Sequence, residues 1–235
     1  MKILGKGRVM GSLNLIKSYD FFKPEEVQER IHIIGCGSVG ATIAELFVKL
    51  GLTKLSLYDF DIVESHNLTN QIYRQSHVGK EKVEALSEIL FEINPNIKQT
   101  LILHREGYVS QKVTGYVILC VDSIETRYKI VSMHVDNPYI KVMFDYRTRL
   151  IDAQHYAAVW DNRGMVKNFL KSMNFNSKEA KKETPVSACN VPLSIAPTIQ
   201  VISSLGVCNF INYVKNKNIK KFIQINLTNF ILDSF

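Results

Sequence analysis

The sequence predicts an α/β protein with a Rossmann-like, mostly parallel central sheet, helices on both faces of that sheet, and a C-terminal hairpin. Three observations predict this fold. Residues 31–61 read as strand, glycine turn, helix, strand and acid, the order of a nucleotide-binding βαβ unit. Residues 116–121 form a continuous apolar run, as in a parallel strand that is buried on both faces. Residues 221–235 form two apolar runs around Thr228-Asn229, which indicates a hairpin.

The glycine turn, residues 35–40, has the sequence GCGSVG. Gly35 permits the tight turn, Gly37 lets a phosphate approach the backbone, and Gly40 lets the next helix pack close to the sheet. The start of that helix offers unpaired N–H groups and the positive end of a dipole to an anion. Asp59 follows Gly40 by 19 residues, close to the ~20 at which an acid meets ribose hydroxyls. The alternative is a glycine turn that only joins two packed elements.

The other elements follow from the order of apolar and polar residues. Apolar residues at spacings of three and four predict helices, and short apolar runs predict strands. We expect helices at 39–50, 80–94 (ended by Pro95), 124–135, 165–173 and 195–214, and strands at 31–34, 55–58, 97–103, 116–121, 140–144 and 155–159. The polar segment 62–79 is long for a compact domain, so we expect it to be functional. Residues 174–190 are polar and lysine-rich, which predicts a mobile loop before the C-terminal helix and hairpin of 195–235.

The bulk composition is that of a soluble globular protein. The chain of 235 residues suits one sizeable domain, with residues 1–30 as an N-terminal leader packed onto it. No apolar run approaches the ~20 residues that cross a bilayer. We therefore expect a cytoplasmic protein that does not enter membranes. The net charge of +7 suits a nucleoside triphosphate or an acidic protein, but the basic residues are scattered, so nucleic-acid binding is not expected.

Three charged residues favour a metal-bound triphosphate over a plain dinucleotide. Asp61 adds a second carboxylate beside Asp59, Lys82 stands at the start of a helix, and Asp122 follows a central strand where open α/β sheets bind ligands. Each residue also has a structural alternative. In that alternative Asp61 would only cap a turn, Lys82 would be a solvated helix residue, and Asp122 would be the N-cap of the next helix.

Four separated motifs resemble the ThiF/MoeB/HesA superfamily, the ubiquitin-activating-enzyme-like adenylyltransferases. They agree with the family in order and spacing over residues 8–130. They are the glycine turn at 35–40, DFDIVESHNLTNQ from Asp59, VGKEK from Val78 to Lys82, and CVDS from Cys120 to Ser123 with Arg127. The resemblance implies that residues 1–235 are a single adenylation domain.

The resemblance implies a reaction and a set of site residues. Family members bind Mg-ATP and activate the C-terminal Gly-Gly carboxylate of a ubiquitin-like or sulfur-carrier protein as an acyl-adenylate, commonly as homodimers. The family positions imply that the Ser38 N–H binds the nucleotide, Asp59 the ribose, Asn67 and Gln71 the phosphates, and that Lys82 neutralises phosphate charge while Asp122 holds Mg²⁺. Gly35, Gly37, Gly40, Asp61, Asn70 and Ser123 complete the implied nucleotide site.

Two departures from the family pattern concern arginines. Asn70 stands where the family has an arginine, and of an N-terminal two-arginine motif only Arg8 is kept, with Gly11 at the second position. Arg74, Lys80 or Arg8 are candidate substitutes, although lysine lacks the planar guanidinium group with which arginine donates two parallel hydrogen bonds. Two alternatives therefore stay open: a catalytically weakened nucleotide-binding subunit of a heterodimeric activating enzyme, and an NAD(P)-dependent oxidoreductase.

The cysteines suggest one further catalytic candidate. The four cysteines form no CxxC pair, so we expect neither structural zinc nor a disulfide framework. Cys189 precedes the long C-terminal helix, where family members carry a cysteine that takes the activated carrier; the alternative is a structural thiol. Cys36, Cys120 and Cys208 are expected to be packing residues. Asp145-Tyr146-Arg147 is either a contact for the carrier tail or a structural ion pair.

Overall fold

The computed structural model describes residues 13–175, 185–186 and 193–235. Its centre is an eight-stranded sheet in the order β3-β2-β1-β4-β5-β6-β7-β8, parallel from β3 to β5 and antiparallel from there on. The strands are β1 Ile31–Ile34, β2 Leu55–Tyr58, β3 Ile102–His104, β4 Gly115–Leu119, β5 Ile140–Thr148, β6 Asp152–Val159, β7 Phe222–Asn226 and β8 Ile231–Ser234. The predicted α/β fold with its C-terminal hairpin is confirmed.

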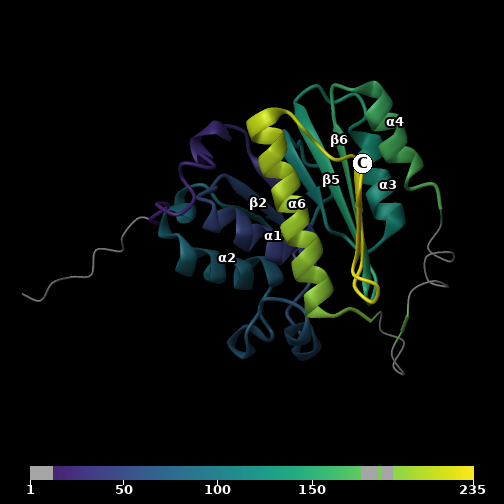
Figure 1. The fold of residues 1–235 in the computed structure, drawn as a ribbon. Helices are drawn as coiled ribbons and strands as arrows, with labels where there is room; N and C mark the ends of the chain where they lie inside the picture. Colours follow the sequence, from purple (N-terminus) through teal and green to yellow (C-terminus); the bar gives the residue numbers. More distant parts are fainter. Residues whose placement is uncertain (1–12, 176–184, 187–192) are drawn as a thin grey trace, which may run out of the picture.

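Helices cover both faces of the sheet (Figure 1). The helices of the described residues are α1 Ser38–Lys49, α2 Lys82–Ile93, α3 Ile124–Met133, α4 Arg163–Lys171 and α6 Ala196–Asn216, with short 3-10 turns at Pro24–Glu26, Ser65–Thr69, Gln75–His77 and Pro95–Gln99. Helices α1, α2 and α6 lie on one face, and α3 and α4 on the other (Figure 1). Strands β1, β2 and β4 are therefore buried along their whole length, which explains their continuous apolar sequence.

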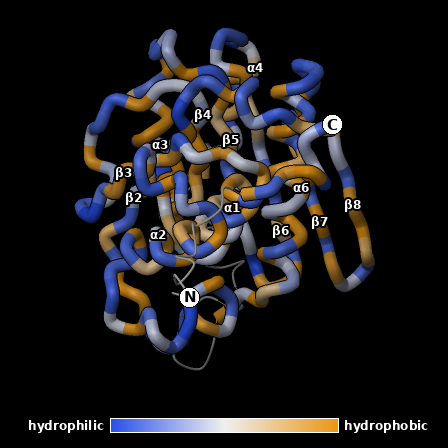
Figure 2. The backbone as a smooth tube through the Cα atoms, turned by 90° about the vertical axis from the view of Figure 1, so that its left-hand side faces the viewer, coloured by the Kyte–Doolittle hydropathy of each residue, from blue (hydrophilic) through white to orange (hydrophobic). Residues whose placement is uncertain are grey.

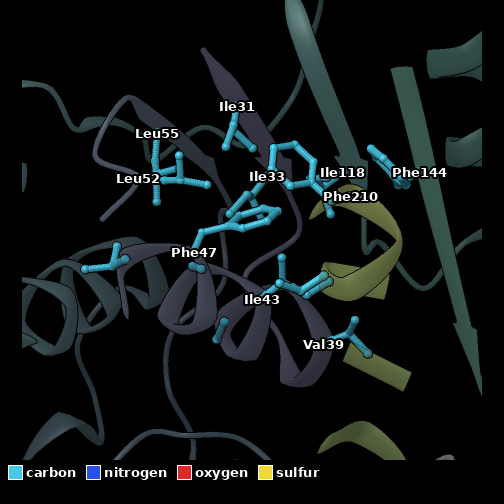
Figure 3. Close-up of a cluster of buried hydrophobic side chains, with 14 of the residues drawn as sticks. Ile31, Ile33, Val39, Ile43, Phe47, Leu52, Leu55, Ile118, Phe144 and Phe210 are labelled. Carbon is cyan, nitrogen blue, oxygen red and sulfur yellow. The ribbon is translucent and has the colours of Figure 1, made fainter. Parts of the chain in front are cut away.

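The larger core cluster lies between the sheet and the α1–α6 layer (Figure 3). The ring of Phe210 on α6 lies 4.9 Å from that of Phe47 on α1 and 4.9 Å from that of Tyr116 on β4. Ile33 and Ile118 on the neighbouring strands β1 and β4 are fully buried in the same cluster. This packing fixes α1, and with it the glycine turn, against the central strands.

Several predicted elements differ from the structure in their bounds. The strand expected at 97–103 is reduced to β3, because Pro95 begins a 3-10 turn that Asn94 caps by accepting a hydrogen bond from the Asn96 N–H. The strand expected to end before Asp145 continues to Thr148, because β6 pairs with it along its whole second half. The helix expected at 165–173 begins earlier, where the Asn162 side chain accepts from the Met165 N–H.

The hairpin of β7 and β8 forms one edge of the sheet (Figure 2). All four residues of β8 are exposed, including Ile231 and Leu232. None of the described helices is long and apolar enough to cross a lipid bilayer. Most of the predicted loop at 174–190 lies outside the described residues, so its predicted mobility stays a prediction.

Candidate functional site

The glycine turn joins the end of β1 to the start of α1, and two of its glycines are required by packing. Gly35 has φ +94°, and a Cβ there would lie 2.7 Å from the carbonyl carbon of Cys120, just beyond β4. A Cβ on Gly40 would lie only 1.9 Å from the Gly35 carbonyl oxygen. Any larger residue at either position would therefore force the turn away from the strand ends.

Gly37, in contrast, faces open space. A Cβ built on it would meet no atom within 4 Å. Gly37 is also the N-cap of α1, and because it has no side chain it makes no side-chain cap for the N–H groups of the first turn. The structure thus places an open cradle of backbone at a helix N-terminus, which is the arrangement that binds phosphate groups. Ser38, the first residue of α1, lies at the same place.

Asp59 follows β2 and binds the glycine turn. Its Oδ2 accepts a hydrogen bond from the Cys36 N–H at 2.6 Å, and its Oδ1 accepts from the Asp61 N–H at 2.9 Å. Burial raises the pKa of Asp59 above its usual value, whereas these hydrogen bonds and the nearby Lys82 act in the opposite direction. Each carboxylate oxygen has a second lone pair, so both keep the capacity to accept from ribose hydroxyls.

Lys82 and Asp61 form an ion pair at the start of α2. The Lys82 Nζ lies 2.6 Å from the Asp61 Oδ2, and the Lys82 N–H donates to the Asp61 carbonyl at 2.9 Å. The Lys82 side chain is 10% exposed, whereas that of Asp61 is 51% exposed. Because half of the Asp61 side chain is exposed, water can solvate this carboxylate when the ammonium group turns to a phosphate.

The polar segment between β2 and α2 holds three of the predicted residues. The Asn67 Oδ1 accepts from the Glu64 N–H at 2.9 Å, so this side chain shapes its own turn. The Asn70 Nδ2 donates to the Ser194 Oγ, which ties the segment to the residues just before α6, at the same end of the sheet (Figure 1). The Gln71 Oε1 is buried and has no hydrogen-bond partner among the described residues, so it remains available to a ligand.

Tyr73 belongs to this site, although its residue type and spacing gave no signal for it. Its hydroxyl lies 2.6 Å from the Cys36 carbonyl oxygen and 3.2 Å from the Lys82 carbonyl oxygen. The side chain is 5% exposed. It therefore connects the polar segment, the glycine turn and the start of α2.

Asp122 and Ser123 follow β4 beside the glycine turn. Asp122 is exposed and lies two residues beyond Cys120, whose backbone contacts Gly35. The N-cap of α3 is Ser123, whose Oγ accepts from the Thr126 N–H at 3.2 Å, so Asp122 is not the N-cap. The Asp122 carboxylate is thereby left at the end of a central parallel strand, next to the turn.

A Mg²⁺ ion that is bound together with phosphates fits this site. Among residues 13–175, 185–186 and 193–235, no three His, Cys, Asp or Glu side chains gather closely enough to hold a metal ion. Mg²⁺ in nucleotide sites needs just one or two carboxylates, because phosphate oxygens and water supply the other ligands. The exposed carboxylate of Asp122 fits that requirement, and it would hold a cation that neutralises phosphate charge.

The candidate substitutes for the missing arginines have other partners. The Arg74 Nη1 lies 2.8 Å from Glu92, and the Lys80 Nζ lies 2.7 Å from Glu88, both on the exposed surface of α2. Arg8 lies outside the described residues. Arg74 and Lys80 are thus engaged in exposed ion pairs with glutamates of α2 in this structure.

Asp145 and Arg147 form a structural network. The carboxylate of Asp145 is fully buried and binds both Arg127 and Arg147, the latter at 2.7 Å from Nε. The remaining Arg147 nitrogens donate to the carbonyl and hydroxyl oxygens of Ser172 at 2.7 and 2.8 Å. Of the two alternatives for residues 145–147, the structure supports the structural ion pair, because Asp145 and Arg147 are already bound within the protein.

The cysteines divide by burial. Cys36 and Cys120 are packed beside the turn, and burial raises the pKa of both thiols. The prediction that Cys208 is a packing residue is wrong, because it lies on the exposed side of α6. Cys189 lies outside the described residues, so its catalytic role stays a prediction.

Comparison with known proteins agrees with the fold and the motifs. A model of the ThiF family matches residues 25–235. The ubiquitin-like modifier-activating enzyme 5 of Caenorhabditis elegans is 29% identical over 119 residues, which are 44% of this chain and 28% of that protein. The Drosophila persimilis protein of the same name is 29% identical over 134 residues, 50% of this chain and 34% of that protein. The match thus spans about a third of these relatives.

Two solved structures have the same fold. The crystal structure of E. coli MccB with ATP gives a TM-score of 0.67 at 17% identity, covering 90% of this chain and 64% of that chain. The crystal structure of PaaA gives a TM-score of 0.66 at 18% identity, covering 90% and 65%. At such identities the likeness shows the fold alone.

Proposed function

Because the chain belongs to the ThiF family, we propose that it is an ATP-dependent adenylyltransferase. Its substrate would be the C-terminal carboxylate of a ubiquitin-like or sulfur-carrier protein ending in Gly-Gly. A carboxylate oxygen attacks the α-phosphorus of ATP, the bond to pyrophosphate breaks, and an acyl-adenylate forms. The observation that carries this proposal is the open backbone at Gly37, with Asp59, Lys82 and Asp122 on the elements around it.

Each residue has a defined task in this reaction. The backbone N–H groups at the start of α1 bind phosphate oxygens. Asp59 accepts hydrogen bonds from the ribose while it holds the turn. Lys82 leaves Asp61 to neutralise phosphate charge, and a Mg²⁺ ion held by Asp122 would add further positive charge. Since the attack joins two anions, charge neutralisation and alignment provide most of the catalysis.

A titration with Mg-ATP tests the proposed site. Wild-type protein is expected to bind Mg-ATP, and Asp122→Asn to weaken that binding by roughly tenfold, the effect of about 1.4 kcal/mol. Without Mg²⁺ the Asp122→Asn protein should bind ATP no more weakly than wild type, because the carboxylate favours ATP only through the metal. Asp136→Asn is the matched control, since Asp136 is an exposed carboxylate whose ion pair with Arg163 lies outside the site. Tight binding of NAD(H) or NADP(H) with no response to ATP would overturn the proposal in favour of an oxidoreductase.

A second candidate is the nucleotide-binding subunit of a heterodimeric enzyme, with weakened chemistry. The presence of Asn70 where the family has an arginine favours it, because an amide supplies no guanidinium charge to the triphosphate. An exchange assay with labelled pyrophosphate and a Gly-Gly carrier separates the two. The adenylyltransferase exchanges label by itself, whereas the weakened subunit binds Mg-ATP and exchanges none until a catalytic partner is added.

Three finer features belong to the same proposal. Cys189 would take the activated carrier from the adenylate as a thioester, releasing AMP. The protein would act as a homodimer, and it would do so in the cytoplasm. The roles of Cys189 and of the homodimer rest on the family resemblance, and the location rests on the composition of the chain.

A further inference from the structure

The glycine turn is held by side chains at two successive peptide groups. Asp59 binds the Cys36 N–H at 2.6 Å, and the Tyr73 hydroxyl binds the Cys36 carbonyl oxygen at 2.6 Å. Both partners come from outside the turn: Asp59 follows β2, and Tyr73 lies 37 residues beyond Cys36 in the polar segment.

The second of these bonds fixes the direction of one N–H group. A trans peptide is planar, so the Cys36 carbonyl and the Gly37 N–H point in opposite directions. Because Tyr73 holds that carbonyl toward the protein interior, the Gly37 N–H points away from the interior. The space around the Gly37 Cα is open, with no atom within 4 Å of a built Cβ.

The same peptide could easily turn over without this bond. A flip of the peptide between residues 36 and 37 changes mainly the ψ of Cys36 and the φ of Gly37, and glycine accepts nearly any φ. A flipped peptide would present a carbonyl oxygen to a bound phosphate in place of an N–H donor. The partial negative charge of that carbonyl oxygen would repel the phosphate. A rigid constraint at this peptide is therefore valuable to a phosphate site and unnecessary for the packing of the turn, which depends on Gly35 and Gly40.

We propose that Tyr73 is a positioning residue that orients the peptide between Cys36 and Gly37 so that the turn presents N–H donors to the triphosphate. The Lys82 carbonyl oxygen lies 3.2 Å from the same hydroxyl, whose single proton goes to the nearer Cys36 carbonyl oxygen. Burial raises the pKa of Tyr73 well above its usual value, so the hydroxyl keeps its proton and remains a donor. This inference rests on the proposed ATP site.

The test compares Tyr73→Phe with wild type in calorimetric titrations of Mg-ATP and of adenosine. Tyr73→Phe removes one oxygen and keeps the buried ring. We expect it to weaken Mg-ATP binding about fivefold to tenfold, the effect of one lost hydrogen bond, and to leave adenosine binding unchanged, because Asp59 still holds the ribose. Tyr156→Phe is the control: its hydroxyl also donates one bond, to Gln154 Oε1 at 3.1 Å, on β6.

The outcomes distinguish the inference from the proposed function. Equal Mg-ATP affinity in Tyr73→Phe and wild type would overturn the role of Tyr73 and leave the ATP site intact. An equal loss for Mg-ATP and adenosine would assign Tyr73 to general stability and overturn its role at the phosphates. Wild-type protein that binds no Mg-ATP would overturn the proposed function, and the inference with it.

Discussion

At the scale of single residues, two glycines of the same turn have opposite requirements. Gly40 is surrounded by backbone, with the Gly35 carbonyl oxygen 1.9 Å from where a Cβ would stand, whereas Gly37 borders open space. The backbone of Gly37 has φ −75°, outside the left-handed region that favours glycine, and ψ −150°, just beyond the usual extended range. The sequence motif treats the two positions alike, but their physical reasons differ: one allows close packing, and the other leaves room for a ligand.

Alanine substitution at Gly40 and at Gly37 should therefore affect different properties, stability in the first case and ATP binding in the second. Gly40→Ala is expected to lower the free energy of unfolding by about 3 kcal/mol, because the new methyl group has to displace backbone. Gly37→Ala should lower the free energy of unfolding by only about 1 kcal/mol, from its unusual ψ, yet weaken Mg-ATP binding by roughly tenfold through the loss of space. Urea denaturation and nucleotide titration measure both quantities. A stable Gly40→Ala protein, or normal ATP binding by Gly37→Ala, would contradict this assignment.

At the scale of elements, helix α6 sets the position of α1 and thereby of the turn. Its Gly206 lies directly against the ring of Tyr146 on β5: a Cβ there would lie 2.1 Å from the Tyr146 hydroxyl oxygen and 2.3 Å from a ring carbon. Four residues further along α6, Phe210 packs on Phe47 of α1. A glycine costs helix stability, so its presence here reflects the close approach of α6 to the sheet.

Gly206→Ala should therefore destabilise the protein although alanine favours helices. We expect a loss of about 1–3 kcal/mol in the free energy of unfolding, from the overpacking against Tyr146. Gly164→Ala in α4 is the matched control, since a Cβ there meets only the Asn162 side-chain oxygen, at 3.3 Å, and its effect should stay within about 0.5 kcal/mol. Chemical denaturation measures the free energy of unfolding of both variants and of the wild type. A Gly206→Ala protein as stable as wild type would show that α6 can shift freely.

At the scale of the whole molecule, burial of two histidines links stability to pH. Burial lowers the pKa of His32 to about 4, helped by the charges of Arg30, His104 and His134. It lowers the pKa of His155 to about 3, with Asp145 acting in the opposite direction. Both side chains stay neutral in the folded protein down to these values, whereas in the unfolded chain they gain a proton below about pH 6.5.

The protein should accordingly lose stability as the pH falls from 6.5 toward 4. The contribution of each histidine to the free energy of unfolding is complete above pH 6.5. Below that pH it declines by about 1.4 kcal/mol per pH unit. Urea denaturation at a series of pH values measures the slope, which His32→Gln or His155→Gln should reduce. His66→Gln, at a side chain that is 60% exposed, should leave the slope unchanged. A slope that is the same in all four proteins would rule out the two buried histidines as its source.

Local sequence determined the fold class, most of the helices and strands, and the family to which the chain belongs. Strands β1, β2 and β4 read as continuous apolar runs because helices cover both faces of the sheet, and the glycine turn is specified by residues that are neighbours in the chain. Periodicity and short motifs depend on contacts within a few residues, so they can be read without a structure.

Tertiary structure alone decided which polar groups meet. Tyr73 reaches Cys36 across 37 residues, Asp145 is buried between two arginines, and Arg74 is paired with a glutamate of α2. The strand expected at 97–103 shortened because Asn94 and Pro95 favour a turn, and Cys208 proved exposed. Hydrogen bonds and ion pairs over such separations depend on how the elements pack, and the spacing of residues along the chain carries no record of that packing.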